Sequence, residues 1–101
     1  MVEINTSEDK NTIQIVFSDD LSVAKASEMH EQLRKFAWEA PTISILTKEV
    51  KNMDLSFLQL LFSFAREMKN SGKKLIFDFQ FEEEMERIFE ESGFQQAFEK
   101  I

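Results

Sequence analysis

The chain has 101 residues, of which 43% are hydrophobic and 31% charged, a composition that predicts one compact domain spanning residues 1–101. Its net charge of −7 disfavours nucleic acid and anionic membrane surfaces as partners, since both require a positively charged surface, and favours a basic protein partner. The absence of cysteine excludes disulfides and thiolate metal sites.

The first third of the chain predicts two strands and a helix. Val2–Ile4 and Thr12–Phe17 alternate apolar and polar residues, which is typical of strands, and the polar turn between them predicts a hairpin. Ser18–Ser22 is predicted to be a loop that ends in helix-capping residue types. Apolar residues at helical spacing then predict a helix from Val23 to about Trp38.

The remainder of the chain alternates predicted strands and helices. Thr42–Leu46 is predicted to be a buried strand, and residues 47–55 a loop. A long helix follows, apolar on more than one side, and Gly72 suits the left-handed residue just past its end. Leu75–Phe79 is predicted to be a strand and Glu82–Glu91 a helix, before a final short helical turn.

This order of elements predicts an α/β fold with a small mixed sheet of about four strands and three to four helices. An N-terminal antiparallel hairpin would be followed by parallel β-α-β crossovers. Binding sites in parallel sheets lie beyond the carboxyl ends of the strands, which are predicted here at Ser18–Ser22, Lys48–Ser56 and Asp78–Glu82. We expect Asp20 at this edge and the junction that contains Asp54 at its centre.

The junction before the long helix has a structural and a functional interpretation. With Ser56 as the N-cap, Gln59 would complete a capping box, and Leu55 with Leu60 a hydrophobic staple. The Ser56 hydroxyl would also be available as a phosphate acceptor or a partner contact, because a cap lies at the exposed end of a helix. Asp54 would cap a helix N–H group, contact a partner, or be phosphorylated as in a receiver domain.

Several segments carry a pattern that goes beyond secondary structure. Val50–Leu61 reads as the end of a strand, a loop, a hydrophobic residue before Asp, a hydroxyl residue and a helix. Gly72–Leu75 has the form Gly-x-x-Leu, and Ile88–Phe94 with Phe98 closes the chain with an aromatic, a glycine and two further aromatics. In this order, together with the early helix after Leu21, these segments resemble the STAS domains of the anti-sigma-factor antagonist family.

In that family, a kinase that is also an anti-sigma factor phosphorylates a Ser or Thr directly after the Asp, and the unmodified form binds this partner. The resemblance places the acceptor position at Leu55, which has no hydroxyl, and the family's second Ser at Ser56. It therefore implies a signalling adaptor, either regulated by phosphorylation at Ser56 or docking constitutively. Phe57 replaces a small glycine and would be either an apolar anchor or simply buried. The residues expected at the partner interface are Asp20, Asp54, Leu55, Ser56, Phe57 and Leu58.

Two other functions remain open at this stage. One is an accessory STAS subunit of a membrane lipid-transport ATPase, and the other is a receiver labelled on Asp54. No motif predicts an enzyme, a metal or a cofactor, because His30 is the only histidine and no glycine-rich phosphate loop is present. No signal peptide or run of about 18 apolar residues occurs, so we expect a cytoplasmic monomer or weak dimer without membrane insertion.

Overall fold

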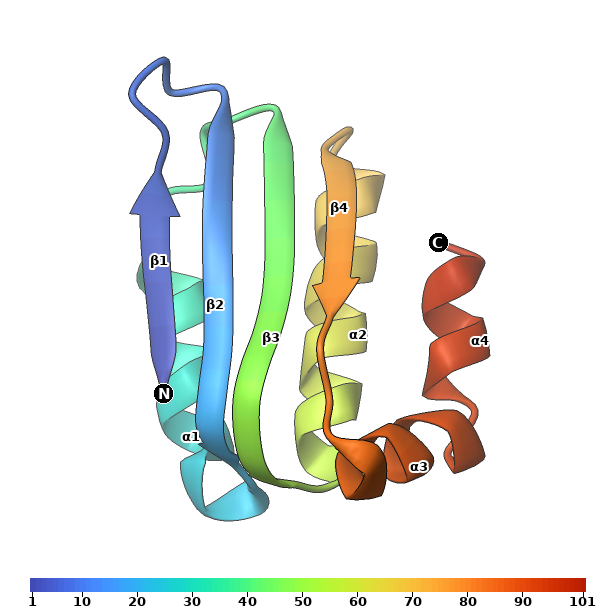
Figure 1. Ribbon diagram of the computed structural model, residues 1–101. Helices are drawn as coiled ribbons and strands as arrows, with labels where there is room; N and C mark the ends of the chain where they lie inside the picture. Colours follow the sequence, from blue (N-terminus) through green and yellow to red (C-terminus); the bar gives the residue numbers. More distant parts are fainter.

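The computed structural model describes residues 1–101 as four strands and four helices (Figure 1). The strands are β1 (Val2–Thr6), β2 (Thr12–Leu21), β3 (Thr42–Met53) and β4 (Lys74–Phe79). The helices are α1 (Val23–Lys35), α2 (Leu55–Asn70), α3 (Glu83–Glu91) and α4 (Phe94–Glu99). Along the chain they follow in the order β1, β2, α1, β3, α2, β4, α3, α4, which confirms the predicted α/β sequence of elements.

The four strands form one sheet in the order β1-β2-β3-β4. β1 pairs with β2 in antiparallel orientation, with Ile4 opposite Ile15. β3 runs parallel to both of its neighbours, so that Ile45 lies opposite Ile15 on one side and opposite Phe77 on the other. The predicted mixed sheet, an N-terminal hairpin followed by parallel crossovers, is therefore confirmed.

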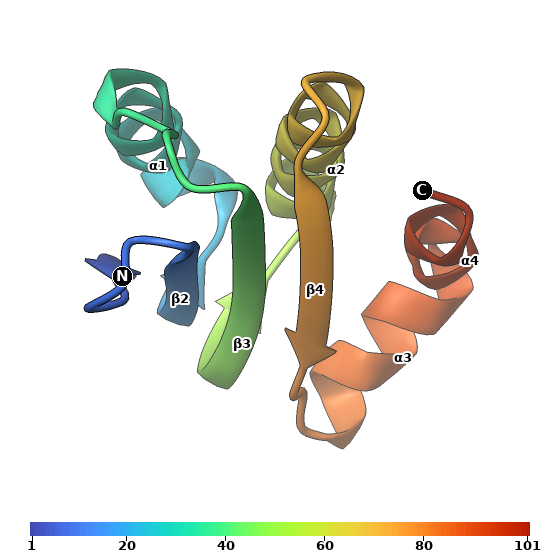
Figure 2. The same ribbon diagram turned by 90° about the horizontal axis from the view of Figure 1, so that it is seen from above.

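The helices cover the sheet unevenly. α1 and α2 lie side by side over one face, whereas α3 and α4 lie beside the edge strand β4 (Figure 2). Alternate strand residues are buried in the core that includes these helices, among them Ile13, Ile15, Phe17, Ile43 and Ile45. Phe57, Leu61 and Ala65 of α2 are completely buried, which explains the broad apolar stripe of this helix. Burying each large side chain contributes about 1.5–3 kcal/mol.

Two strands are longer than the sequence predicts. β2 continues through Asp20 to Leu21, where a loop was expected, and β3 continues to Met53 through the segment predicted as the loop 47–55. Backbone irregularities in the two strands explain why the sequence pattern underestimates their length. Asp19 and Glu49 have positive φ values of 64° and 49°, and the register between β2 and β3 shifts around Asp19. Bulges of this kind break the two-residue alternation on which strand prediction depends.

The first helix is shorter than predicted. α1 ends at Lys35, and the next residue is already extended, with φ −76° and ψ 144°. Trp38 lies outside the helix and turns back, so that its indole Nε1 donates a hydrogen bond of 2.8 Å to the carbonyl oxygen of Leu33. The ring of Trp38 packs against Phe36 and Phe64, at centroid distances of 4.7 Å and 4.9 Å. The apolar run after Lys35 thus belongs to a turn that packs on the core.

The predicted glycine stop is confirmed. Gly72 follows α2 with a left-handed φ of 86°, which is a conformation that glycine adopts without steric cost. Gly93, between α3 and α4, has the same φ and directly precedes Phe94. The ring of Phe94 packs against Phe62 of α2 and Phe98 of α4, so this turn connects the C-terminal helices to the rest of the molecule.

Candidate functional site

The N-cap of α2 is Asp54 and not Ser56, so the predicted capping box is wrong. Asp54 has an extended backbone, with φ −135° and ψ −179°, and its Oδ1 accepts hydrogen bonds from the backbone N–H groups of Ser56 (3.0 Å) and Phe57 (3.4 Å). Aspartate caps a helix as well as serine does, and the longer β3 brings it to the cap position. Leu55 is 54% exposed at the first helical position, so it forms no buried staple with Leu60.

The second carboxylate oxygen of Asp54 caps a different helix. Its Oδ2 accepts a hydrogen bond of 2.7 Å from the backbone N–H of Val23, the first residue of α1 and 31 positions earlier in the chain. Ser22, which precedes α1, makes no side-chain capping bond of its own. One carboxylate therefore joins the positive ends of two parallel helices. The structural interpretation of Asp54, that it caps a helix N–H group, is confirmed.

Asp20 lies beside this junction and organises the turn into α1. Its Oδ1 accepts hydrogen bonds from the backbone N–H of Ser22 (3.1 Å) and from Nδ2 of Asn52 (3.4 Å). The hydrogen bond from the Ser22 side chain is the main cause that lowers the pKa of Asp20, and the hydrogen bond from the Ser22 backbone adds to it. Partial burial of the carboxyl group acts in the opposite direction. Asp20 and Asp54 thus fall at the same end of the sheet, where the sequence predicts them.

Phe57 and Leu58 are not surface residues. Both are completely buried, and the ring of Phe57 packs edge-on against Phe17 of β2 at 5.2 Å. The expectation that Phe57 serves as an exposed apolar anchor, with Leu58 beside it, is therefore corrected. The alternative of simple burial holds, because the first turn of α2 faces the sheet with these two positions and solvent with Leu55.

The apolar side chains that do face solvent at this end are Val23 and Leu55. They are 65% and 54% exposed, and each is the first residue of its helix. Because Asp54 joins the two helix starts, we group Val23, Leu55 and the half-buried Ser56 as the helix-start patch. Val23 is a candidate contact residue that the sequence patterns do not single out. The signal available was its position directly after a capping residue, which matches that of Leu55.

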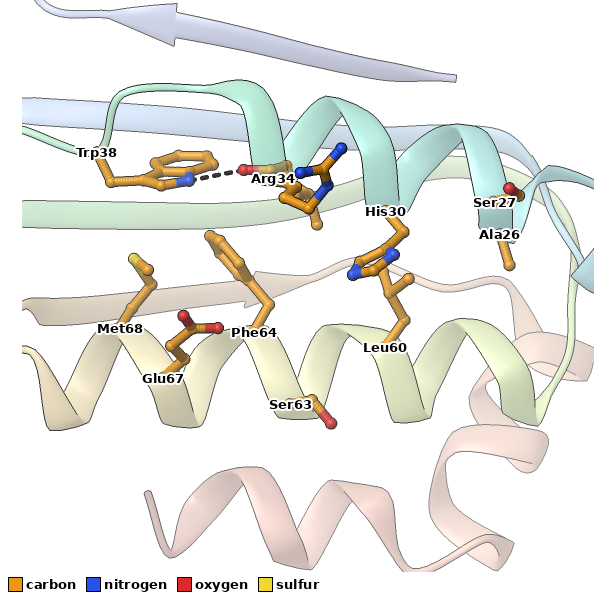
Figure 3. A pocket seen from close by; sticks show the side chains of 11 residues that line it. Ala26, Ser27, His30, Arg34, Trp38, Leu60, Ser63, Phe64, Glu67 and Met68 are labelled. Atoms are coloured by element: carbon orange, nitrogen blue, oxygen red, sulfur yellow. Dashed lines mark hydrogen bonds between the residues drawn. The ribbon is translucent and has the colours of Figure 1, made fainter.

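A groove lies between α1 and α2. It has a volume of about 540 Å³ and is lined by Ala26, Ser27, His30, Leu33, Arg34, Trp38, Leu60, Ser63, Phe64, Glu67 and Met68. In Figure 3, His30 of α1 and Leu60 of α2 face one another across it, with Trp38 and Phe64 farther along. Ala26 and Leu60 lie one helical turn beyond Val23 and Ser56, so the groove begins one turn away from these two residues of the patch.

Metal-binding clusters and membrane-spanning helices are not found in the structure. The chain contains no group of three or more His, Asp or Glu side chains placed to hold a metal ion. None of its four helices combines the length and apolar character needed to span a bilayer.

Comparisons with known proteins agree with the observed fold. A family model described as "Mlab, STAS domain" matches residues 4–100. The phosphorylated form of the Bacillus cell fate determinant SpoIIAA superposes with a TM-score of 0.68 at 17% identity, covering 95% of this chain and 86% of that one. The unphosphorylated form of the anti-sigma factor antagonist SpoIIAA gives 0.67 at 15% identity, with coverages of 93% and 82%.

A further solved structure is similar. The antisigma-factor antagonist STAS domain from Rhodobacter sphaeroides superposes with a TM-score of 0.65 at 15% identity, covering 77% of this chain and 84% of that one. No curated protein sequence matches the chain. At these identities the solved structures show a shared fold, and the family model extends over almost the whole chain.

Proposed function

This chain belongs to the STAS domain family, and we propose that it is a non-enzymatic signalling adaptor, resembling an anti-sigma-factor antagonist, that captures a partner protein through the helix-start patch. The observation that carries the proposal is the exposure of Val23 and Leu55 at the shared start of two helices. Solvent-exposed apolar side chains that neighbour an apolar groove are typical of protein contact surfaces. The groove between α1 and α2 extends this surface with Trp38 and Leu60.

The chemistry of Leu55 supports docking without a switch at this position. Relatives that are switched by phosphorylation need a hydroxyl directly after the Asp, and Leu55 presents an exposed isobutyl group there instead. An apolar side chain gains free energy when a partner covers it, whatever the kinase activity in the cell. We infer that the contact at Leu55 is constitutive.

Ser56 is the remaining site at which phosphorylation would regulate docking. It has the only hydroxyl in the first turn of α2, and its side chain is half-buried beside Leu55. A phosphate would add about 1.5 to 2 negative charges close to the Asp54 carboxylate, which already occupies the N–H groups of Ser56 and Phe57. The repulsion would weaken capture of a partner and the capping of both helices.

The test is affinity capture from native lysate with quantitative mass spectrometry. Leu55→Gln removes the exposed apolar group without adding charge, and Ile76→Gln is the matched control, because Ile76 is also exposed (45%) but lies on strand β4. We expect Leu55→Gln to lower recovery of the main partner about tenfold, because this is the effect of removing one central apolar contact. Ile76→Gln should recover the partner as well as the unmodified chain does. Equal recovery by both variants would remove the patch from consideration. The same spectra report phosphate on Ser56.

The second candidate function is that of an accessory subunit of a membrane lipid-transport ATPase. The lack of a hydroxyl at Leu55 favours it, because a permanent subunit needs a contact that no kinase releases. Capture separates the two functions: a subunit would co-purify with an ATPase in a constant ratio, and an antagonist would co-purify with a kinase-like or sensor protein.

The receiver interpretation predicts covalent phosphorylation of Asp54. Both of its carboxylate oxygens are engaged by backbone N–H groups, and both helix starts depend on them. We therefore expect no labelling of Asp54 by acetyl phosphate and Mg²⁺, which mass spectrometry of the intact chain checks.

A further inference from the structure

A second feature of the molecule is a small pocket beside the edge strand β4. It has a volume of about 280 Å³ and is lined by Phe77, Phe79, Glu86, Phe89, Gln95, Phe98 and Glu99, which we call the phenylalanine–glutamate pocket. Its walls come from the edge strand β4 and from α3 and α4, which lie beside it in Figure 2. It shares no residue with the helix-start patch or with the α1–α2 groove.

Four phenylalanine rings line this pocket. Phe77 and Phe79 are half-buried and stack at 5.4 Å with an interplanar angle of 17°. Phe98 meets both of them, at 5.3 Å and 5.1 Å, and Phe89 lies 4.9 Å from Phe79. These rings carry no hydroxyl group, and a phenyl ring attracts a cation through the negative electrostatic potential of its face.

The acidic side chains of the pocket lack cationic partners. The ion pairs of the chain join Glu31 to Arg34 and Lys35, and none involves Glu86 or Glu99. Burial, together with the neighbouring Glu90, raises the pKa of Glu86, which is the direction expected for a carboxyl group without a compensating positive charge. Five of the nine residues of α3 are glutamate, so the surface around the pocket attracts cations.

We propose that the phenylalanine–glutamate pocket binds an arginine side chain from a basic segment of a partner protein. A guanidinium group is planar, stacks on phenyl rings and donates hydrogen bonds to carboxylates, so it satisfies both halves of the pocket at once. The volume suits one side chain, since it lies below the range of about 300–1,000 Å³ that is typical of small-molecule sites. The net charge of −7 favours the approach of a basic segment.

The experiment titrates the ¹⁵N-labelled full chain with the peptide acetyl-Gly-Arg-Gly-amide and, in parallel, with its citrulline analogue. Citrulline has the shape of arginine but no charge. With the arginine peptide, we expect amide chemical-shift changes centred on Phe77, Phe79 and Phe98. The citrulline peptide should bind at least about fivefold more weakly, because an exposed charge pair or cation–π contact contributes about 1 kcal/mol. A lysine peptide forms the third arm.

Matched variants separate the pocket from general acidity. Glu86→Gln and Glu99→Gln should each weaken binding of the arginine peptide about threefold, whereas Glu91→Gln, an exposed glutamate outside the pocket, should leave it unchanged. Equal binding of the arginine and citrulline peptides, no binding at all, or equal effects of all three variants would overturn the proposal. Lysine binding as tight as arginine binding would overturn the assignment to arginine. None of these outcomes bears on Leu55.

Discussion

The helix-start patch and the phenylalanine–glutamate pocket are organised in opposite ways. At the helix starts, the Asp54 carboxylate accepts hydrogen bonds from backbone N–H groups, and the apolar side chains of Val23 and Leu55 are exposed to solvent. In the pocket, half-buried stacked rings such as Phe79 line the wall together with carboxylates such as Glu86, which have no cationic partner. The two surfaces therefore suit different partners: contact at the first removes exposed apolar area from water, and contact at the second supplies a positive charge that the pocket lacks.

Substitutions in the core beneath the helix starts should change stability most. Phe57→Ala should lower the free energy of unfolding by about 3–5 kcal/mol, because the ring is completely buried and packs against Phe17. Leu55→Ala, two residues earlier and exposed, should change it by less than about 0.5 kcal/mol. Urea denaturation followed by circular dichroism measures both. Similar losses in the two variants would mean that Leu55 is part of the core.

Removing the carboxylate that joins the helices should have the next largest effect. Asp54→Ala leaves two helix starts without a side-chain cap, and each lost cap costs about 0.5–2 kcal/mol, so we expect about 1–4 kcal/mol in total. The control is Asp78→Ala, because this exposed carboxylate accepts a side-chain bond only from Gln80. If both variants lowered the unfolding midpoint equally, Asp54 would have no special role.

The ring faces of the pocket should matter less for stability than for binding. Phe77→Leu keeps the site apolar but removes the stack on Phe79 and the contact with Phe98, at a cost below about 1.5 kcal/mol. The arginine peptide should nevertheless bind more weakly to this variant. Ile76→Leu, the neighbour in β4, should change neither quantity. A stability loss as large as that of Phe57→Ala would place Phe77 in the main core.

The smallest expected effect is an opposite pH response of the two regions. The lowered pKa of Asp20 means that its ionised form stabilises the fold, a contribution present above the usual aspartate range and lost as pH falls through the folded pKa. The raised pKa of Glu86 means the reverse: its protonated form is favoured in the fold, and this contribution is lost as pH rises through the folded pKa. At neutral pH, Asp20→Asn should therefore lower the melting temperature and Glu86→Gln raise it slightly.

Thermal melts between acidic and neutral pH measure both changes in melting temperature, the decrease for Asp20→Asn and the increase for Glu86→Gln. Both differences from the unmodified chain should shrink in acid, where the carboxyl groups of the unmodified chain are protonated as well. A shift of the same sign for both variants at neutral pH would contradict the contrast between the two regions.

The sequence predicts the fold well and the site in part. Periodic apolar residues and glycine stops such as Gly72 locate every strand and helix, because these signals are local. The bulge around Asp19 and the left-handed Glu49 hide the second half of β2 and β3, because they interrupt the alternation. The hydrogen bond from Val23 to Asp54 spans 31 positions, and no local pattern reports a contact at that separation.

The exposure of single residues is the other property that the sequence does not determine. Leu55 and Phe57 are two apolar residues in one helical turn, and only the direction in which α2 faces the sheet decides which of them is buried. The sequence could identify the junction as a site but not the side chains that a partner would meet. Because of this limit, sequence patterns do not single out Val23, and they leave open whether Phe57 is an exposed anchor or a buried residue.

Hydrogen–deuterium exchange on the complex recovered by affinity capture tests whether the helix-start patch is the partner surface. We predict slower exchange in the segments that contain Val23 and Leu55 when the partner is bound, and unchanged exchange around Ile76 on β4. Unchanged exchange at both helix starts, in a complex that protects another surface, would show that the partner binds elsewhere.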